Sequence, residues 1–113
     1  MSLRLEQADS FREDFALQAL WYVREAGEDV ARRFHEAVDS TMRSLCRQPD
    51  LGRIRRFRHP TLQGLRSIPL ERPFDKLLIF YRLEGDCVQA WRLMHGARDL
   101  PRRLRQPPGA GAE

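Results

Sequence analysis

Side chains that can do chemistry gather in one short segment near the end of the chain, His95-Gly96-Ala97-Arg98-Asp99. An imidazole transfers protons near neutral pH, and a guanidinium holds phosphate or carboxylate oxygens in a planar fork. The segment follows an apolar run, so we expect it at the end of a strand, where side chains converge. The alternative is structural, with an Arg98–Asp99 ion pair or a helix N-cap at Asp99. The pattern favours a functional role for Arg98 and leaves the role of His95 open.

Other polar positions are candidates for contact with a ligand. Arg66 follows Gly64, beside which a ligand backbone or phosphate can approach closely, although a surface arginine on an edge strand has the same pattern. Tyr81 lies in an apolar run and is interpreted as a core residue in preference to a functional one, with a hydroxyl that needs a partner. The basic loop Arg53–His59, in which Phe57 can stack, is interpreted as a solvated loop in preference to a phosphate-binding patch.

Charge is distributed unevenly along the chain. Residues 1–46 carry six arginines and nine acidic residues, which gives −3, whereas residues 47–113 carry fourteen basic and seven acidic residues, which gives +7. Lys76 is the single lysine among the twenty cations. A coding bias explains the choice of arginine over lysine but not the asymmetry. The basic half predicts a partner that is a nucleic acid or an acidic protein.

Length and composition predict one compact domain. The chain has 113 residues, 42% of them hydrophobic, and we expect residues 1–105 to fold together and Gln106–Glu113 to be a disordered tail. No apolar run reaches the roughly 18–20 residues that cross a bilayer, and the N-terminus lacks the apolar stretch of a signal peptide. Cys46 and Cys87 are isolated, which favours a cytoplasmic protein with reduced thiols. We expect no metal, no cofactor and no membrane partner.

The first half of the chain predicts a short strand followed by a helical hairpin. Two leucines near the N-terminus alternate with polar residues, as in a strand. Apolar residues recur at helical spacing over residues 11–26 and again over residues 30–45, and Gly27 separates the two runs. Asp9 and Ser10 are expected to cap the first helix, with Glu13 completing a capping box with Ser10, and Asp29 is expected to cap the second helix.

The second half predicts strands. Three apolar, β-rich runs cover residues 65–70, 76–83 and 87–94, and the middle run, apolar on both faces, is expected to be the central strand. A short basic helix or turn is expected at Leu100–Leu104. The order of elements predicts an α+β domain, with an N-terminal strand and a helical hairpin packed on a small, mostly antiparallel β-sheet. The core between hairpin and sheet is expected to contain Phe15, Phe34, Val38, Leu45, Ile79 and Phe80.

Several short motifs follow one another in a characteristic order over about residues 10–100. They are Asp14-Phe15, Trp21-Tyr22, Ala31-x-x-Phe34, Leu45-x-x-x-Pro49-x-x-Gly52-Arg53, Leu62-x-Gly64-Leu65-Arg66, Leu78-Ile79-Phe80-Tyr81-Arg82 and the segment from His95 to Asp99. Each motif alone is weak, but the combination resembles the RelE/ParE superfamily of type II toxins, and within it the ParE, or plasmid-stabilisation, branch.

The resemblance implies a toxin that a cognate antitoxin keeps silent. The antitoxin would wrap the helical hairpin and a sheet edge, and operator DNA would be bound only through the antitoxin. Trp21 and Tyr22 cannot both face the same core, so they are the expected antitoxin-binding residues. The residues expected to contact the toxin's target are Arg66, Lys76, Tyr81, His95, Arg98 and Asp99.

Two mechanisms occur in that superfamily. ParE-like toxins bind and stall DNA gyrase without chemistry of their own, whereas RelE-like toxins are metal-free ribonucleases that cut mRNA on the ribosome. RNA cleavage needs a base and cations on the phosphate, for which His95 and Arg98 are the catalytic candidates. However, the chain lacks the C-terminal tyrosine of RelE-like enzymes, and arginines replace their lysines. We therefore expect a gyrase inhibitor, with the ribonuclease and an inactive co-repressor as alternatives.

Overall fold

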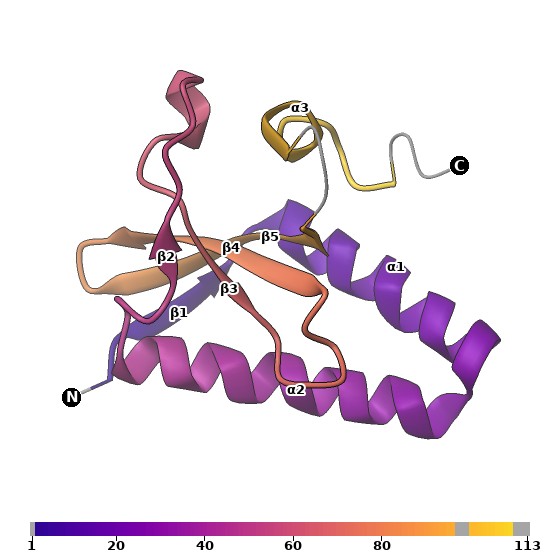
Figure 1. Cartoon of the computed structure of the whole chain (residues 1–113). Coiled ribbons are helices and arrows are strands. Elements are labelled where there is room, and N and C mark those ends of the chain that lie inside the picture. Colours follow the sequence, from indigo (N-terminus) through magenta and orange to yellow (C-terminus); the bar gives the residue numbers. More distant parts are fainter. Residues whose placement is uncertain (1, 97–99, 110–113) are drawn as a thin grey trace.

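Two long helices lie against one face of a five-stranded sheet in the computed structural model, which describes residues 2–96 and 100–109 (Figure 1). The strand order is β1-β5-β4-β3-β2, in which β1 runs parallel to β5 and the other pairs are antiparallel. The expected central strand is therefore confirmed as β4. The elements are β1 (Arg4–Gln7), α1 (Asp9–Ala26), α2 (Glu28–Arg47), β2 (Arg53–Ile54), the 3-10 helix η1 (Pro60–Leu62), β3 (Arg66–Pro69), β4 (Leu77–Glu84), β5 (Cys87–His95) and α3 (Leu100–Leu104).

The helical hairpin is confirmed, but both predicted caps are wrong. Gly27 joins α1 to α2 with a φ of 96°, a left-handed conformation that favours glycine, and its N–H donates to the carbonyl of Tyr22. Helix α1 begins at Asp9 and α2 begins at Glu28, so Asp9, Ser10 and Asp29 lie inside the helices. Neither helix has a side-chain cap at its N-terminus. Asp29 instead pairs with Arg32 one turn later on the exposed face of α2.

The main core lies between the helical hairpin and the sheet. It contains Phe34, Val38, Leu45 and Ile79, all at most 1% exposed, as predicted. Phe15 is only partly buried and stacks on Phe34 with ring centroids 5.3 Å apart.

The prediction for Phe80 is wrong. Adjacent residues of a strand point to opposite faces, so Phe80 cannot share the core with Ile79. Phe80 is fully buried in a second core on the other face of the sheet. This second core is covered by α3 and by the segment between β2 and β3 that contains η1. Its other buried members are Leu62, Leu65, Leu100 and Leu104.

A buried ion pair connects α1 to β5. Arg92 donates from Nε and Nη2 to the two carboxylate oxygens of Asp14, at 2.7 and 3.0 Å, and the Leu93 N–H donates to the same carboxylate at 3.0 Å. Arg92 Nη1 donates to the carbonyl of Leu104, the last residue of α3, and to that of Gln106, just after α3. Arg92 sits at a β-bulge, because Phe80 pairs with Arg92 whereas Tyr81 pairs with Ala90. One guanidinium thereby joins α1, β5 and the end of α3.

We predict that Phe34→Ala lowers the free energy of unfolding by about 3–5 kcal/mol, because it empties a fully buried position. Denaturant unfolding followed by circular dichroism measures the change. Leu20→Ala on the exposed face of α1 is the control and should cost less than about 1 kcal/mol. A similarly small cost for Phe34→Ala would show that the phase of α2 is wrong.

We also predict that Asp14→Ala lowers the free energy of unfolding by about 3–5 kcal/mol, because it leaves the buried Arg92 charge without its partner. The matched control is Asp29→Ala, which removes a carboxylate from exposed ion pairs and should leave the unfolding midpoint unchanged. Equal midpoints for the two variants would contradict the role given to the buried pair.

Candidate functional site

One end of the sheet brings together two of the predicted target-binding residues. His95 is the last residue of β5 and pairs with Leu77, and the neighbouring Gly96 N–H donates to the carbonyl of Lys76 at 3.2 Å. Burial lowers the pKa of His95, and the charges of Arg103 on α3 and of Lys76 lower it further. The lowered pKa of His95 favours the neutral form of its imidazole. Arg98 and Asp99, the other predicted residues of this segment, lie outside the described residues.

A groove of about 640 Å³ connects this sheet end to α1. Trp21 and Tyr22 line it from α1, His95 lines it from β5, and Arg103 lines it from α3. Tyr22 also packs on Phe34 with ring centroids 5.0 Å apart, whereas Trp21 is 55% exposed. The expectation that these aromatic residues cannot share the core is confirmed. The groove brings the predicted antitoxin-binding residues beside a predicted target-binding residue.

The outer face of α1 carries an apolar stripe. Leu17, Leu20 and Trp21 stand at helical spacing and are 45–55% exposed. A soluble monomer rarely leaves a contiguous apolar surface of this kind uncovered, and such surfaces mark sites where another protein binds. Helix α1 is therefore apolar on its outer face as well as on the face that packs against the core. Packing against the core does not explain the apolar residues of the outer face.

Arg66 and Tyr81 lie elsewhere and brace the turn that follows α2. The Tyr81 hydroxyl donates to the Pro49 carbonyl at 2.7 Å and accepts from the Gly52 N–H at 2.8 Å, and Arg66 donates to the Gly52 carbonyl at 2.8 Å. A Cβ on Gly52 would meet the Tyr81 hydroxyl at 2.5 Å. Tyr81 is fully buried, which agrees with its interpretation as a core residue.

The alternative interpretation of Arg66, a surface arginine on an edge strand, is wrong, because β2 pairs outside β3. The structure therefore does not place the predicted target-binding residues in one cluster. Lys76 and His95 share one end of the sheet, whereas Arg66 and Tyr81 belong to the turn at Gly52.

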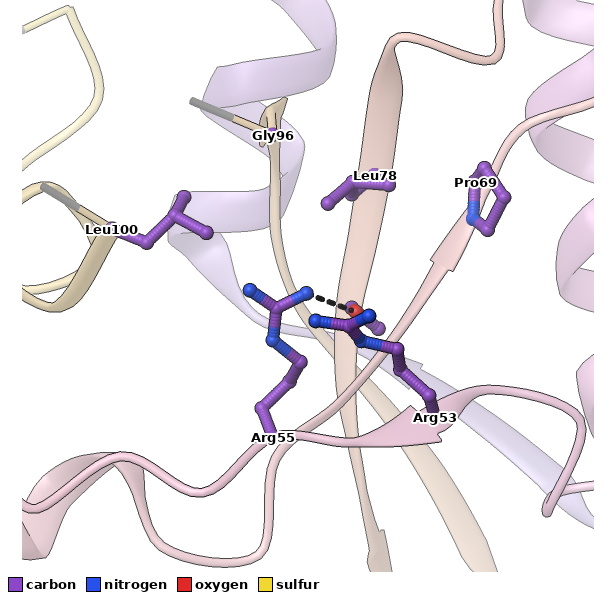
Figure 2. Close-up of a pocket in the computed structure, with 7 residues that line it drawn as sticks. Arg53, Arg55, Pro69, Leu78, Gly96 and Leu100 are labelled. Atoms are coloured by element: carbon purple, nitrogen blue, oxygen red, sulfur yellow. Dashed lines mark hydrogen bonds between the residues drawn. The ribbon is translucent and has the colours of Figure 1, made fainter. Parts of the chain in front are cut away.

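Sequence reasoning missed a second concavity, on the face of the sheet opposite the long helices. Figure 2 shows Arg53 and Arg55 reaching into it from β2 and the residues just after it. Arg55 is half-buried and donates to the Ser67 hydroxyl at 3.2 Å, so the interpretation of a solvated loop fails for this residue. The sequence signal that could have revealed this concavity is the spacing of Arg53 and Arg55. Two residues that are two positions apart in extended chain point to the same side.

The His, Cys, Asp and Glu side chains of residues 2–96 and 100–109 form no group of three or more that could hold a metal ion. None of their helices is long and apolar enough to cross a membrane.

Comparison with known structures agrees with this fold. A chain of the chromosomal ParDE toxin–antitoxin system from P. aeruginosa is 20% identical, with a TM-score of 0.67 over 83% of this chain and 96% of that chain. A chain of a RelBE toxin–antitoxin complex from Mycobacterium tuberculosis is 17% identical, with a TM-score of 0.54 over 84% of this chain and 99% of that chain. At these identities the likeness establishes the RelE/ParE fold.

Comparison of sequences defines the family. No curated protein sequence matches the chain. The family described as the ParE toxin of the type II toxin–antitoxin system parDE matches residues 5–100, which include both long helices and all five strands of the sheet. The chain therefore belongs to the ParE toxin family of type II toxin–antitoxin systems.

Proposed function

We propose that the chain acts in the cytoplasm as an inhibitor of DNA gyrase and that a cognate antitoxin neutralises it. The observation that carries the proposal is the character of the sheet end at His95. The positive charges of Lys76 and Arg103 act on this histidine, and the lining of the groove beside it includes apolar residues of α1 and β5. Such a surface suits the binding of an acidic or nucleic-acid-bearing target.

A ribonuclease is the second candidate, because the lowered pKa of His95 favours the neutral imidazole, which could accept a proton. Cleavage also needs a group that donates a proton to the leaving oxygen. Among the described residues that line the groove, the carboxylate of Asp14 is already paired with Arg92, and Tyr22 packs on the core. These contacts favour a binding role over catalysis.

The groove also supports a simple mechanism of neutralisation. An amphipathic helix of the antitoxin could bury Leu17, Leu20 and Trp21 and continue along the groove, which ends at His95. An antitoxin in this position would cover part of the surface that we assign to gyrase. Binding of antitoxin and binding of target would then exclude each other, without any change in the toxin's fold.

We predict that Trp21→Ala weakens the binding of the antitoxin encoded beside this gene by about tenfold to a hundredfold, as expected for a central aromatic contact. Isothermal titration calorimetry with the purified antitoxin measures the affinity. Leu83→Ala is the control, because Leu83 is also an exposed apolar residue but lies on β4 near its turn to β5. Equal affinities for both variants would place the antitoxin elsewhere.

We predict that Arg98→Ala weakens toxicity, because it removes a cation that we expect to contact the target, and that the thermal melt stays close to that of the wild type. Purified wild-type toxin should stall supercoiling by gyrase, and the effect should weaken as salt screens the charges. Induced cells should show a DNA damage response with intact mRNA. Codon-phased mRNA cuts that His95→Ala abolishes, with supercoiling untouched, would instead assign the chain to the ribonucleases.

A further inference from the structure

The segment between β2 and β3, residues 55–65, projects from the sheet as an arm with η1 at its tip (Figure 1). The arm rises on the side of the sheet away from α2 (Figure 1). Between Asp50 and Glu71 the sequence has five arginines and no acidic residue. The arm therefore carries positive charge that its own part of the chain does not balance.

Two arginines of the arm, Arg56 and Arg58, are exposed to solvent. Among the described residues, no carboxylate forms an ion pair with either of them. Neither belongs to the lining of the concavity that Arg53 and Arg55 share. Arg56 and Arg58 are therefore two cations on the outer surface of the arm, available to an anionic partner.

Contacts with β4 and with the second core hold the arm in place. Arg82 on β4 donates from Nε to the carbonyl of Gln63 at 3.0 Å, and Gln63 Nε2 donates to the carbonyl of Phe57 at 2.7 Å. The Arg55 N–H donates to the carbonyl of Leu65 at 2.9 Å, which joins the two sides of the arm, and Leu65 is fully buried. An arm that is ordered before binding loses little conformational entropy when it binds.

The exposed surface of the arm is polar, because its larger apolar side chains pack on the second core. The exposed positions are Arg56, Arg58, Pro60, Thr61, Gln63 and Gly64. The centre of a protein–protein interface is apolar and depleted of charge. Contacts with a phosphate backbone, by contrast, use arginine together with threonine and glutamine side chains. The composition of the arm therefore favours nucleic acid over an acidic protein.

The arm suits a double strand better than a single strand. Proteins hold single strands through aromatic side chains on which the bases stack. The Phe57 ring packs on the second core, and the guanidinium carbon of Arg55 lies 5.5 Å from its centroid, so this ring is not free to stack on a base. The major groove of B-form DNA is about 12 Å wide and admits a two-stranded ribbon, whereas that of duplex RNA is deep and narrow.

We propose that the arm binds double-stranded DNA, with Arg56 and Arg58 on its phosphates. The contact is independent of base sequence, because phosphates carry no direct sequence information. It therefore differs from operator binding, which we expect only through the antitoxin. The inference goes beyond the gyrase proposal and does not rest on it, because it uses no residue of the groove at His95.

The test is fluorescence anisotropy of the purified full-length toxin with a fluorescein-labelled DNA duplex of about two helical turns, or roughly 20 base pairs. R56Q/R58Q should weaken binding by about tenfold and reduce the slope of log affinity against log salt by roughly two, as for two lost phosphate contacts. Arg58→Gln alone should reduce the slope by roughly one.

The matched control is R24Q/R43Q, which removes the same charge from exposed positions of α1 and α2 and should change the affinity by no more than about twofold. Thermal melts of both double variants should match that of the wild type, because all four side chains are exposed. Equal weakening by the two double variants would indicate general attraction between charges and would overturn the assignment.

Competing ligands in the same assay decide the class of partner. Tighter binding of one separated strand than of the duplex, or equal binding of a duplex RNA with the same dependence on Arg56 and Arg58, would contradict the assignment to double-stranded DNA. Tighter binding of a glutamate-rich peptide would identify an acidic protein as the partner. No measurable binding of the duplex at low salt would exclude the ligand. The assay contains no gyrase, so failure here and failure of the gyrase proposal are distinguishable.

Discussion

The ion pair between Asp14 and Arg92 is the interaction on which the arrangement of this toxin depends. A charge buried to this extent destabilises the fold unless every donor and acceptor forms a hydrogen bond. Here the Asp14 carboxylate accepts hydrogen bonds from the Arg92 guanidinium and from the Leu93 N–H. The remaining donor of Arg92 goes to carbonyls at the end of α3. Since one side chain holds α1, the bulge in β5 and α3, none of the three can shift without leaving a buried polar group unpaired.

The same pair contributes to the walls of the groove at His95 and of the concavity on the other face of the sheet. Asp14 lines the groove next to Trp21 and Tyr22, and α3, which Arg92 holds, contributes Arg103 to the opposite side of that groove. On the other face of the sheet, α3 contributes Leu100 to the concavity that Arg53 and Arg55 also line. A small basic helix of five residues thus separates two concavities, and a buried guanidinium supports its position.

The sequence predicted the order of the elements other than β2 and η1, the central strand and most of the main core, because helical and strand periodicities are local properties. It misplaced Phe80 because two adjacent residues of a strand were assigned to one face. It could not reveal the partnership of Asp14 and Arg92, which are 78 residues apart, or the bulge that orients Arg92. Tertiary contacts also decided the role of Arg66, which holds a turn, and of Arg55, which enters a pocket.

The central functional claim is that antitoxin and gyrase compete for the surface between the α1 stripe and His95. The most direct measurement is retention of gyrase on immobilised toxin while purified antitoxin is added. If the two compete, gyrase is released in proportion to the antitoxin bound, and each bound antitoxin frees gyrase from one toxin molecule. A stable ternary complex, in which gyrase stays on a toxin saturated with antitoxin, would contradict it.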